Sequence, residues 1–252
     1  RPPRSTQGVS SAASDVYKRQ ILQPGYLPWL GFFDQMQKAD VFVYLDDVQF
    51  DKHGWRNRNR IKNSNGQASW LTVPIRHRGK GKPLVNEVEI DGQSRWARKH
   101  IETLRQSYAA APYFKPYLGE LTEILSKDWK QLIDLNWEVT QLLMSWLNIK
   151  TPIVWASSMD INCGSNKRLV QICKKLDATC YLTGDAARAY LDTDLFSSEN
   201  IEVTWHDYSH PQYPQLHGDF IPYLSVVDLI LNCGDNSSNI LNAAHSPTGQ
   251  IT

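Results

Sequence analysis

The chain has 252 residues, of which 27 are basic and 26 acidic, so its net charge at neutral pH is +1. This length allows one large core. Because the basic and acidic residues are nearly equal in number, the net charge gives no reason to expect a nucleic-acid partner. No apolar run approaches the roughly 18 residues that a membrane-spanning helix needs, and no secretory signal is recognisable. The composition is typical of a soluble cytoplasmic protein.

The first twenty residues do not read as natural protein. Residues 10–20 are the translation of a transposase-type sequencing adapter, and residues 1–6 translate part of a flow-cell primer. The alternative is a transit peptide, which is also rich in Arg and Ser. The adapter interpretation predicts that residues 1–20 lie outside the core, that their deletion changes stability by no more than about 0.5 kcal/mol, and that native residues completing the first strand are missing before Ile21. Without residues 1–20 the chain has 23 basic and 25 acidic residues.

The remaining residues alternate strand patterns with helix patterns. In chain order, the predicted elements are a strand ending at 21–23, a helix at 29–39, a strand at 41–45, a hairpin of strands 55–61 and 70–74, a mobile basic loop at 76–82, a strand at 85–90, a helical stretch at 94–147 broken at Pro112 and Pro116, a strand at 153–155, a helix at 168–175, a strand at 180–182, a helix at 186–190, a strand at 202–205 and a helix at 224–231. This order predicts an α/β fold in one domain, Rossmann-like, with a mostly parallel sheet, flanking helices and a helical middle segment.

The four cysteines show no C-x-x-C spacing and have no matching histidine partners. They are Cys163, Cys173, Cys180 and Cys233. We expect reduced, mostly packed thiols and no metal site.

Two aspartates end the strand at 41–45. Asp46 and Asp47 come directly after it, and Gln49 follows them. Ligands of α/β sheets bind outside the carboxyl ends of the strands, so these side chains are expected at a site. We predict that Asp46 or Asp47 acts there as a general base.

Arginines alternate with tryptophan and amides in the next segment. The predicted ligand-binding side chains of this segment are Trp55, Arg56, Asn57, Arg58, Asn59 and Arg60. On an extended segment alternate side chains share a face, so the three guanidiniums point one way and the indole and amides point the other. Guanidiniums suit a phosphate or carboxylate, and an indole can stack on a ring. The alternative is a solvated basic edge strand.

Three weaker features have both a functional and a structural interpretation. The loop at 23–31, with Gln23 and Tyr26, leads to a helix N-terminus that could bind an anion, or it is a rigid turn. Gly184 makes a similar passage from strand to helix. His210 could carry a proton in a proline-fixed loop, or it is a structural histidine.

The start of the middle helical stretch carries another candidate group. Trp96 and His100 are one helical turn apart and share a face, and Lys99 precedes the histidine. They form either a ligand-facing group or a buried aromatic pair. His100 is the second choice for a catalytic base.

These motifs together resemble the WbqC-like protein family. They are 23–31 (Q-P-x-Y-x-P-x-x-G), 46–49 (D-D-V-Q), 54–61 (G-W-x-N-R-N-R-I), 72–74 (T-V-P), 96–100 (W-x-x-K-H), Tyr108 with Ala111 and Pro112, 181–184 (Y-L-x-G), 210–215 (H-P-x-Y-P-Q) and 224–228 (L-S-x-x-D). The resemblance implies one WbqC-like domain at 21–241, followed by a C-terminal tail at 242–252.

The family is associated with bacterial surface-polysaccharide, or O-antigen, gene clusters, and a glycine or aminoacyl transferase role has been suggested for it. The resemblance therefore implies an enzyme that transfers a small acyl or aminoacyl group, such as glycyl, to a sugar. The implied partners are a sugar linked to a nucleotide or a lipid carrier, and an acyl or aminoacyl donor. No pattern identifies a cofactor.

Two alternative functions stay open. The opening segments also resemble adenylyl-forming nucleotidyltransferases, but Trp29 and Phe32 stand where those enzymes have the two histidines of His-x-Gly-His. A nucleotide-binding protein or ATP-dependent ligase is one alternative. A non-catalytic scaffold for polysaccharide assembly is the other.

Overall fold

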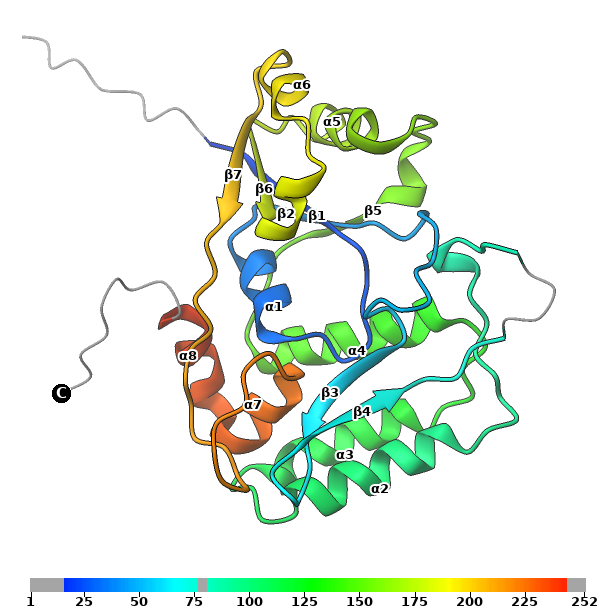
Figure 1. The fold of residues 1–252 in the computed structure, drawn as a ribbon, viewed down its shortest axis with the longest axis vertical. Coiled ribbons are helices and arrows are strands. Elements are labelled where there is room, and N and C mark those ends of the chain that lie inside the picture. The colour runs from blue at the N-terminus through cyan, green and yellow to red at the C-terminus, as the bar shows by residue number, and fades with distance from the viewer. Residues whose placement is uncertain (1–15, 77–80, 244–252) are drawn as a thin grey trace, which may run out of the picture.

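The computed structural model describes residues 16–76 and 81–243 (Figure 1). The strands are β1 (Lys18–Leu22), β2 (Val41–Tyr44), β3 (Arg58–Lys62), β4 (Ala68–Thr72), β5 (Ile153–Trp155), β6 (Cys180–Gly184) and β7 (Glu202–His206). The helices are α1 (Leu30–Gln37), α2 (Trp96–Tyr108), α3 (Phe114–Leu125), α4 (Leu132–Trp146), α5 (Ser165–Lys175), α6 (Thr193–Ser197), α7 (Val226–Cys233) and α8 (Ser237–Ala243). Short 3-10 turns are η1 (Val85–Glu87), η2 (Ala156–Met159), η3 (Asp185–Ala189) and η4 (Gly234–Asn236).

Five parallel strands form the main sheet in the order β5-β2-β1-β6-β7. Counted along the chain, this is the order 3-2-1-4-5 of doubly wound nucleotide-binding folds. The chain runs outward from the central strand β1 in one direction and then returns to add β6 on its other side. The predicted α/β class, with its mostly parallel sheet and flanking helices, is therefore confirmed.

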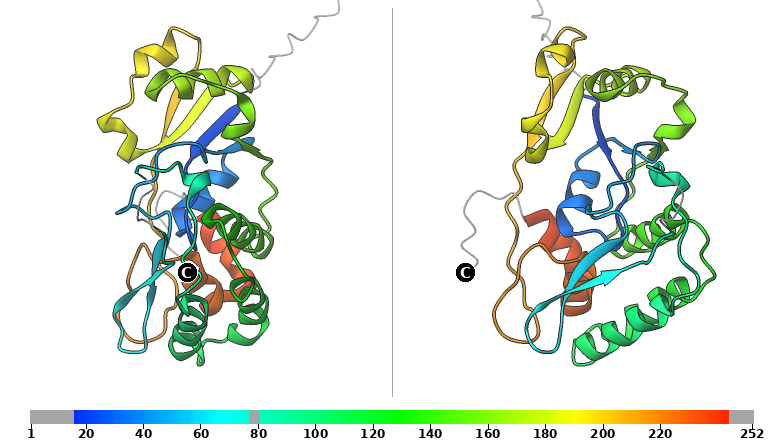
Figure 2. Two further views of the ribbon diagram at one scale, coloured as in Figure 1. Left: turned by 90° about the vertical axis from the view of Figure 1, so that its right-hand side faces the viewer. Right: turned by 45° about the vertical axis from the view of Figure 1, so that its right-hand side comes forward.

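Each face of the sheet has its own hydrophobic cluster. On one face, Ile21 and Val43 pack with Val170 and Cys173 of α5 and with Phe196 of α6. The larger cluster lies on the other face and includes residues of α1, α4 and α7. It continues into α2, α3 and the β3–β4 hairpin, which lie farther from the sheet (Figures 1 and 2).

Three predicted elements differ from the structure. The first half of the strand predicted at 85–90 is the turn η1, because the Glu87 carboxylate accepts from the Leu84 N–H at 2.9 Å and closes a local turn, and Glu89 and Ile90 form only isolated β-bridges. The helix predicted at 186–190 is the 3-10 turn η3, and α6 follows it unpredicted. Pro116 does not break the helical stretch, because it lies in the first turn of α3, where no intrahelical partner is lost. Most of the predicted mobile loop at 76–82 lies outside the described residues.

The prediction that residues 1–20 lie outside the core is wrong for Lys18–Gln20. These residues pair with β6 on one side, and Arg19 and Gln20 also pair with β2 on the other. The Gln20 side chain is fully buried and donates to Gln35 Oε1 at 2.6 Å. A parallel ladder is made by backbone groups that every non-proline residue carries, so these residues can complete the strand whatever their origin. The origin of residues 1–20 stays a prediction. The C-terminal tail expected at 242–252 begins within α8, which extends to Ala243, and the rest of it lies outside the described residues.

Truncation tests this pairing. A chain starting at Val16 keeps all of β1, whereas a chain starting at Ile21 loses the ladder of Lys18–Gln20 with both neighbours. With about 1 kcal/mol for each backbone hydrogen bond, the shorter chain should be less stable by at least about 2 kcal/mol. Urea unfolding of both chains measures this. Equal midpoints would contradict the placement of Lys18–Gln20 in the sheet.

Candidate functional site

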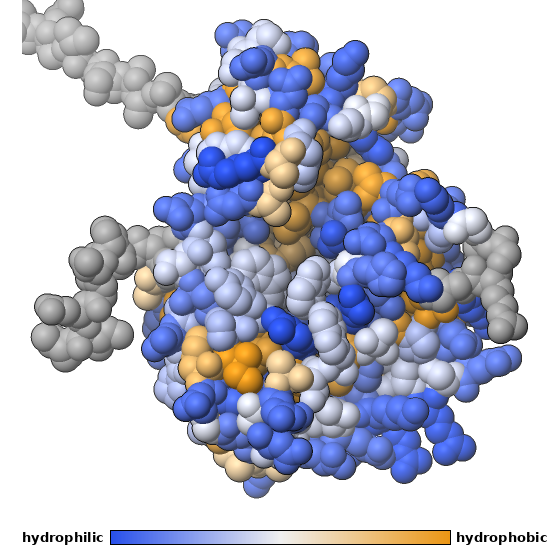
Figure 3. Space-filling view, viewed as in Figure 1, coloured by the Kyte–Doolittle hydropathy of each residue, from blue (hydrophilic) through white to orange (hydrophobic). Residues whose placement is uncertain are grey.

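A pocket of about 330 Å³ lies at the carboxyl edge of the sheet, on the side covered by α5. We call it the sheet-edge pocket. Its lining residues are Ile21, Leu22, Gln23, Leu45, Val48, Arg56, Ser165, Asn166, Arg168, Leu169, Tyr181 and Tyr190. In the space-filling view, a hollow with hydrophobic residues in its depth separates the part that carries α5 from the loop after β2 (Figure 3).

The topology explains why the pocket forms there. Connections leave β1 and β6 at the same edge, and β1 is the strand at which the chain reverses its direction of winding. Neighbouring connections that diverge leave a crevice outside the carboxyl ends of the strands. Residues at the end of β1, Leu45 directly after β2, Tyr181 within β6 and the start of α5 line this crevice.

Buried polar atoms without partners gather at this pocket. Among the described residues, Gln23 Oε1, Arg56 Nε, Asn166 Oδ1 and Arg168 Nε are buried and make no hydrogen bond. Asp47 Oδ1, beside Arg168, is in the same state. Such groups cost roughly 1–3 kcal/mol each when left unpaired. Four of these atoms belong to residues that line the pocket and the fifth lies beside it, so the pocket offers donors and acceptors that a ligand could use.

Two guanidiniums give the pocket its charge. Arg168 forms an ion pair with the Asp47 carboxylate, and both side chains are mostly buried. Arg56 donates to the Pro24 carbonyl at 3.4 Å. Burial lowers the pKa of Arg56 to about 10, against the opposing effect of Asp51, so Arg56 remains charged at neutral pH. Asp47 thus pairs with Arg168, whereas Arg56 feels the charge of Asp51 without forming an ion pair with it.

The N-terminus of α5 adds to this positive field. Ser165 and Asn166 lie in its first turn and line the pocket, and the N-cap residue Gly164 has no side chain to cap it. Helix N-terminal N–H groups favour anions. The arrangement suits an anionic group with an apolar or ring-shaped remainder against Leu45 and Leu169.

Asp46 and Asp47 have different surroundings. Asp46 is buried, and its two oxygens accept from the Ser157 N–H at 3.0 Å and from Asn86 Nδ2 at 3.3 Å. Asp46 therefore ties the end of β2 to two neighbouring turns. Asp47 keeps one oxygen without a partner beside the pocket.

The predicted alternation after Trp55 holds for the two amides but does not bring the three arginines to one place. Asn57 donates to the Val73 carbonyl, and Asn59 donates to the Leu27 carbonyl at 2.7 Å, so both amides point inward. The arginines do not share one site. Arg56 lines the pocket, whereas Arg58 and Arg60 lie on the outer face of the β3–β4 hairpin.

Trp55 lies on the side of Arg60, not with the amides, and its ring is exposed. The expected alternation fails at this residue because β3 begins only at Arg58.

The predicted group around His100 is part of the core. The Tyr26 hydroxyl and His100 Nδ1 are 2.9 Å apart, and Trp96 packs against both rings. Burial lowers the pKa of His100 to about 4, against a backbone hydrogen bond at Thr72 that raises it. His100 is thus neutral at physiological pH. Lys99 is exposed on α2.

The other predicted side chains lie apart from the pocket. His210 interacts through Nδ1 with the Pro211 carbonyl at 2.9 Å and accepts the Tyr223 N–H through Nε2 at 3.0 Å, which matches a structural histidine. Gly184 ends β6 beside Gln35.

The loop at 23–31 contributes Gln23 to the pocket and otherwise forms a packed turn. The Trp29 ring lies over Gly31, where an added Cβ would approach it to 2.1 Å, so this indole covers the first turn of α1. Trp29 also contacts Tyr208 and Tyr223. The anion site expected at this helix N-terminus is therefore filled by an aromatic ring.

Several motif residues meet in a buried network around Asp228. Its carboxylate accepts from the hydroxyls of Tyr108 at 2.6 Å and Tyr213 at 2.9 Å, and from Gln215 Nε2 at 2.8 Å. Burial raises the pKa of Asp228. The network joins α2, α7 and the 210–215 segment and explains these motifs structurally.

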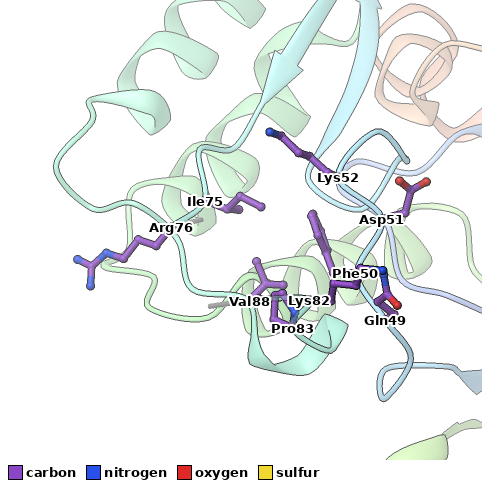
Figure 4. Close-up of a pocket in the computed structure, with 10 residues that line it drawn as sticks. Gln49, Phe50, Asp51, Lys52, Ile75, Arg76, Lys82, Pro83 and Val88 are labelled. Carbon is purple, nitrogen blue, oxygen red and sulfur yellow. The ribbon is translucent and has the colours of Figure 1, made fainter. Parts of the chain in front are cut away.

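A second cavity of about 420 Å³ lies on the other side of the loop that follows β2. Phe50, Ile75, Pro83 and Val88 converge in it, and the Arg76 side chain points away (Figure 4). The predicted residue Gln49 lines this cavity and not the sheet-edge pocket.

Sequence reasoning missed Ser165, Asn166, Arg168 and Tyr190. The helix predicted at 168–175 begins three residues too late, which hid its first turn. The general rule that helix N-termini after sheet strands face the ligand could have indicated them.

Comparisons with known proteins agree with the motifs. The family model described as WbqC-like protein family matches residues 23–240. A Mycobacterium tuberculosis protein with the name uncharacterized protein Rv1507c is 37% identical over 226 residues, which are 89% of this chain and 97% of the relative. No solved structure matches this chain. Within residues 16–76 and 81–243, no helix has the length and apolar character to span a membrane.

The burial of His100 predicts a pH dependence of stability. Its pKa is about 4 in the folded chain against an ordinary value of 6.5, so the unfolded chain binds more protons between these values. Stability should fall as the pH falls through this window, by on the order of 3 kcal/mol for this group. In His100→Gln, urea unfolding between pH 7 and 4 should show a shallower pH slope, while His53→Gln, at an exposed histidine, should match the wild type. Identical slopes for both variants would show that His100 is not buried as a neutral ring.

Proposed function

This chain belongs to the WbqC-like protein family, and from that premise we propose that it binds a phosphate-bearing sugar in the sheet-edge pocket and transfers a small acyl or aminoacyl group to that sugar. The sugar is linked to a nucleotide or a lipid carrier. The observation that carries the proposal is the set of unpaired buried polar atoms around this one pocket. The setting implied by the family is cytoplasmic assembly of bacterial surface polysaccharide, with glycyl as one transferred group.

Arg56 and Arg168 hold the phosphate in this proposal. A guanidinium offers a planar fork of donors that matches a phosphate, and the Nε of each arginine still lacks a partner. The N-terminus of α5 contributes further N–H donors. The phosphate would draw Arg168 from its ion pair with Asp47.

Asp47 is then the general base. Its Oδ1 lacks a partner beside the pocket, and a carboxylate freed from Arg168 can accept the proton of an attacking hydroxyl or amine. The sugar oxygen or nitrogen forms a bond to the acyl carbon of the donor as its proton moves to Asp47. The bond between the acyl carbon and the donor's carrier group then breaks, and the carrier leaves with the electron pair and takes up the proton from Asp47. Asp46 is less suited, because both of its oxygens already accept hydrogen bonds. His100 takes no step here, because its ring is packed against Tyr26 and Trp96.

A nucleotide-binding or ATP-dependent ligase function is the second candidate. The order 3-2-1-4-5 of the sheet strands favours it, since this order recurs in nucleotide-binding folds. Trp29 and Phe32 replace the histidines of adenylyl-forming nucleotidyltransferases, and Trp29 covers the first turn of α1. Any nucleotide would therefore bind on the α5 side.

Thermal shift with defined ligands tests phosphate binding. At about 100 times its Kd, a nucleotide-sugar such as UDP-glucose should stabilise the chain by roughly 2.7 kcal/mol, which raises Tm by about 5–10 °C. Arg168→Gln should abolish this shift because it removes a phosphate donor. Arg98→Gln is the matched control, since Arg98 pairs with Glu102 on the exposed face of α2.

The other outcomes separate the alternatives. A shift with ATP alone supports the ligase. No shift with any nucleotide, nucleotide-sugar or aminoacyl donor, together with a stable protein partner, supports the scaffold and contradicts the transferase. An unchanged shift in Arg168→Gln would place the ligand elsewhere.

The two aspartates give a separate test of catalysis. In a strain that lacks the gene, complementation with Asp47→Asn should fail to restore the acyl or aminoacyl substituent of the surface polysaccharide, because the loss of a general base typically costs about 10²–10⁴ in rate. Mass spectrometry of the polysaccharide measures this. Both variants should lower Tm, Asp47→Asn through the loss of its mostly buried ion pair with Arg168 and Asp46→Asn through the contacts with Ser157 and Asn86, so circular dichroism is needed to confirm that each variant is folded. A knockout that leaves the polysaccharide unchanged would contradict the proposed transfer.

A further inference from the structure

The outer face of the β3–β4 hairpin carries two tryptophans and two arginines. We call Trp55, Arg58, Arg60 and Trp70 the indole–guanidinium face. The Trp55 and Trp70 rings lie 5.1 Å apart at an angle of 35°. The guanidinium of Arg58 lies 4.6 Å from the Trp70 ring centre, and that of Arg60 lies 5.6 Å from Trp55 and 5.8 Å from Trp70. The β3–β4 hairpin that carries these side chains lies at the edge of the molecule (Figure 2).

The strand register builds this face. Arg60 is directly opposite Trp70 in the antiparallel pair, and Arg58 is opposite Thr72, one diagonal step from Trp70. Side chains of opposed residues project from the same face of a hairpin. The inward residues Asn59 and Ile61 are buried and anchor the hairpin on the core. The face is therefore held rigidly, although it is exposed.

Among the described residues, no side chain covers the outer faces of the two indoles. Trp55 is 43% exposed and Trp70 is 48% exposed. Large aromatic rings that stay in water beside one another are typical of binding surfaces. An indole offers a flat apolar ring on which the C–H face of a sugar can lie.

The two arginines bring charge that the described part of the chain does not neutralise. Within residues 16–76 and 81–243, neither Arg58 nor Arg60 forms an ion pair with a carboxylate. Arg58 donates to the His53 carbonyl at 2.5 Å, and Arg60 reaches the Tyr223 carbonyl at 3.5 Å. These contacts with neutral carbonyls position the guanidiniums, and the positive charge remains available to an anion.

We propose that the indole–guanidinium face binds an acidic saccharide, with sugar rings on Trp55 and Trp70 and a carboxylate of the saccharide on Arg58 and Arg60. Stacked indoles recognise the rings, and the planar fork of a guanidinium recognises a carboxylate. A nucleic acid is disfavoured, because the chain has nearly balanced charge and only two cations make up the face.

The indole–guanidinium face lies next to the sheet-edge pocket, which suggests a role for the bound saccharide. Trp55 and Arg56 are consecutive, and Arg56 lines the sheet-edge pocket. The Trp55 carbonyl accepts the Tyr26 N–H at 3.3 Å, which fixes this link to the loop after β1. A saccharide on the face thus reaches toward the pocket, as part of the acceptor of the transfer. This role rests on the proposed function, whereas saccharide binding itself does not.

Isothermal titration calorimetry with oligosaccharides of equal length tests the inference. Tetragalacturonate should bind at least about tenfold more tightly than neutral maltotetraose, a difference of about 1.4 kcal/mol. Trp70→Ala and Arg60→Gln should each weaken tetragalacturonate binding by about tenfold or more. Arg188→Gln is the matched control, because Arg188 lies 4.2 Å over the Trp205 ring at a different surface. Trp55→Ala provides a second aromatic variant, with circular dichroism of every variant to confirm folding.

Three results would overturn the inference. They are no saccharide binding by the wild type, equal loss of binding in Arg188→Gln, and tighter binding of oligouridylate than of tetragalacturonate. Arg168→Gln separates this site from the pocket, since it should lose the nucleotide-sugar thermal shift and keep tetragalacturonate binding. If Arg168→Gln keeps both the nucleotide-sugar thermal shift and tetragalacturonate binding, the proposed function is contradicted and the saccharide site is not.

Discussion

Strand β1 pairs in parallel with β2 on one side and β6 on the other, and the candidate site depends on that double pairing. Because all strands of the sheet are parallel, their carboxyl ends meet at one edge. The connections that leave this edge diverge around β1, and the backbone cannot close the crevice between them. Side chains line it, including Gln23 after β1, Leu45 after β2 and Arg168 from α5. The site is therefore a consequence of topology before it is a consequence of any single residue.

The parts of the chain outside the sheet hold Arg56 in place. Asn136 of α4 donates to the Arg56 carbonyl at 2.8 Å, and the Tyr26 N–H donates to the Trp55 carbonyl. Gly25 allows this approach, because a Cβ there would lie 3.1 Å from the Trp55 oxygen. The helical middle segment thus supports the hairpin, and the hairpin brings Arg56 to the pocket and the indoles to the surface. Rigid support of this kind keeps two guanidiniums at a fixed spacing, as phosphate recognition requires.

The sequence predicted the α/β class because its strands are short apolar runs separated by helical periodicity. It also singled out Asp47, Gln23 and Arg56, since all three follow or adjoin strand ends, and the structure brings them to or beside the sheet-edge pocket. It could not separate Asp47 from Asp46, because that difference depends on Ser157 and Asn86, which are distant in the chain. It could not place Arg168 beside Asp47 for the same reason. The prediction from composition that Lys18–Gln20 lie outside the core was wrong, because backbone pairing in a parallel sheet does not require apolar side chains.

The most direct test of the account is a crystal structure of the chain with bound UDP-glucose. We predict that phosphate oxygens lie within hydrogen-bond distance of the Arg56 and Arg168 guanidiniums, at the N-terminus of α5, with Asp47 released from its ion pair. A ligand bound in the cavity beside Phe50, or an unoccupied sheet-edge pocket in crystals that hold the nucleotide-sugar elsewhere, would contradict the assignment of this pocket as the functional site.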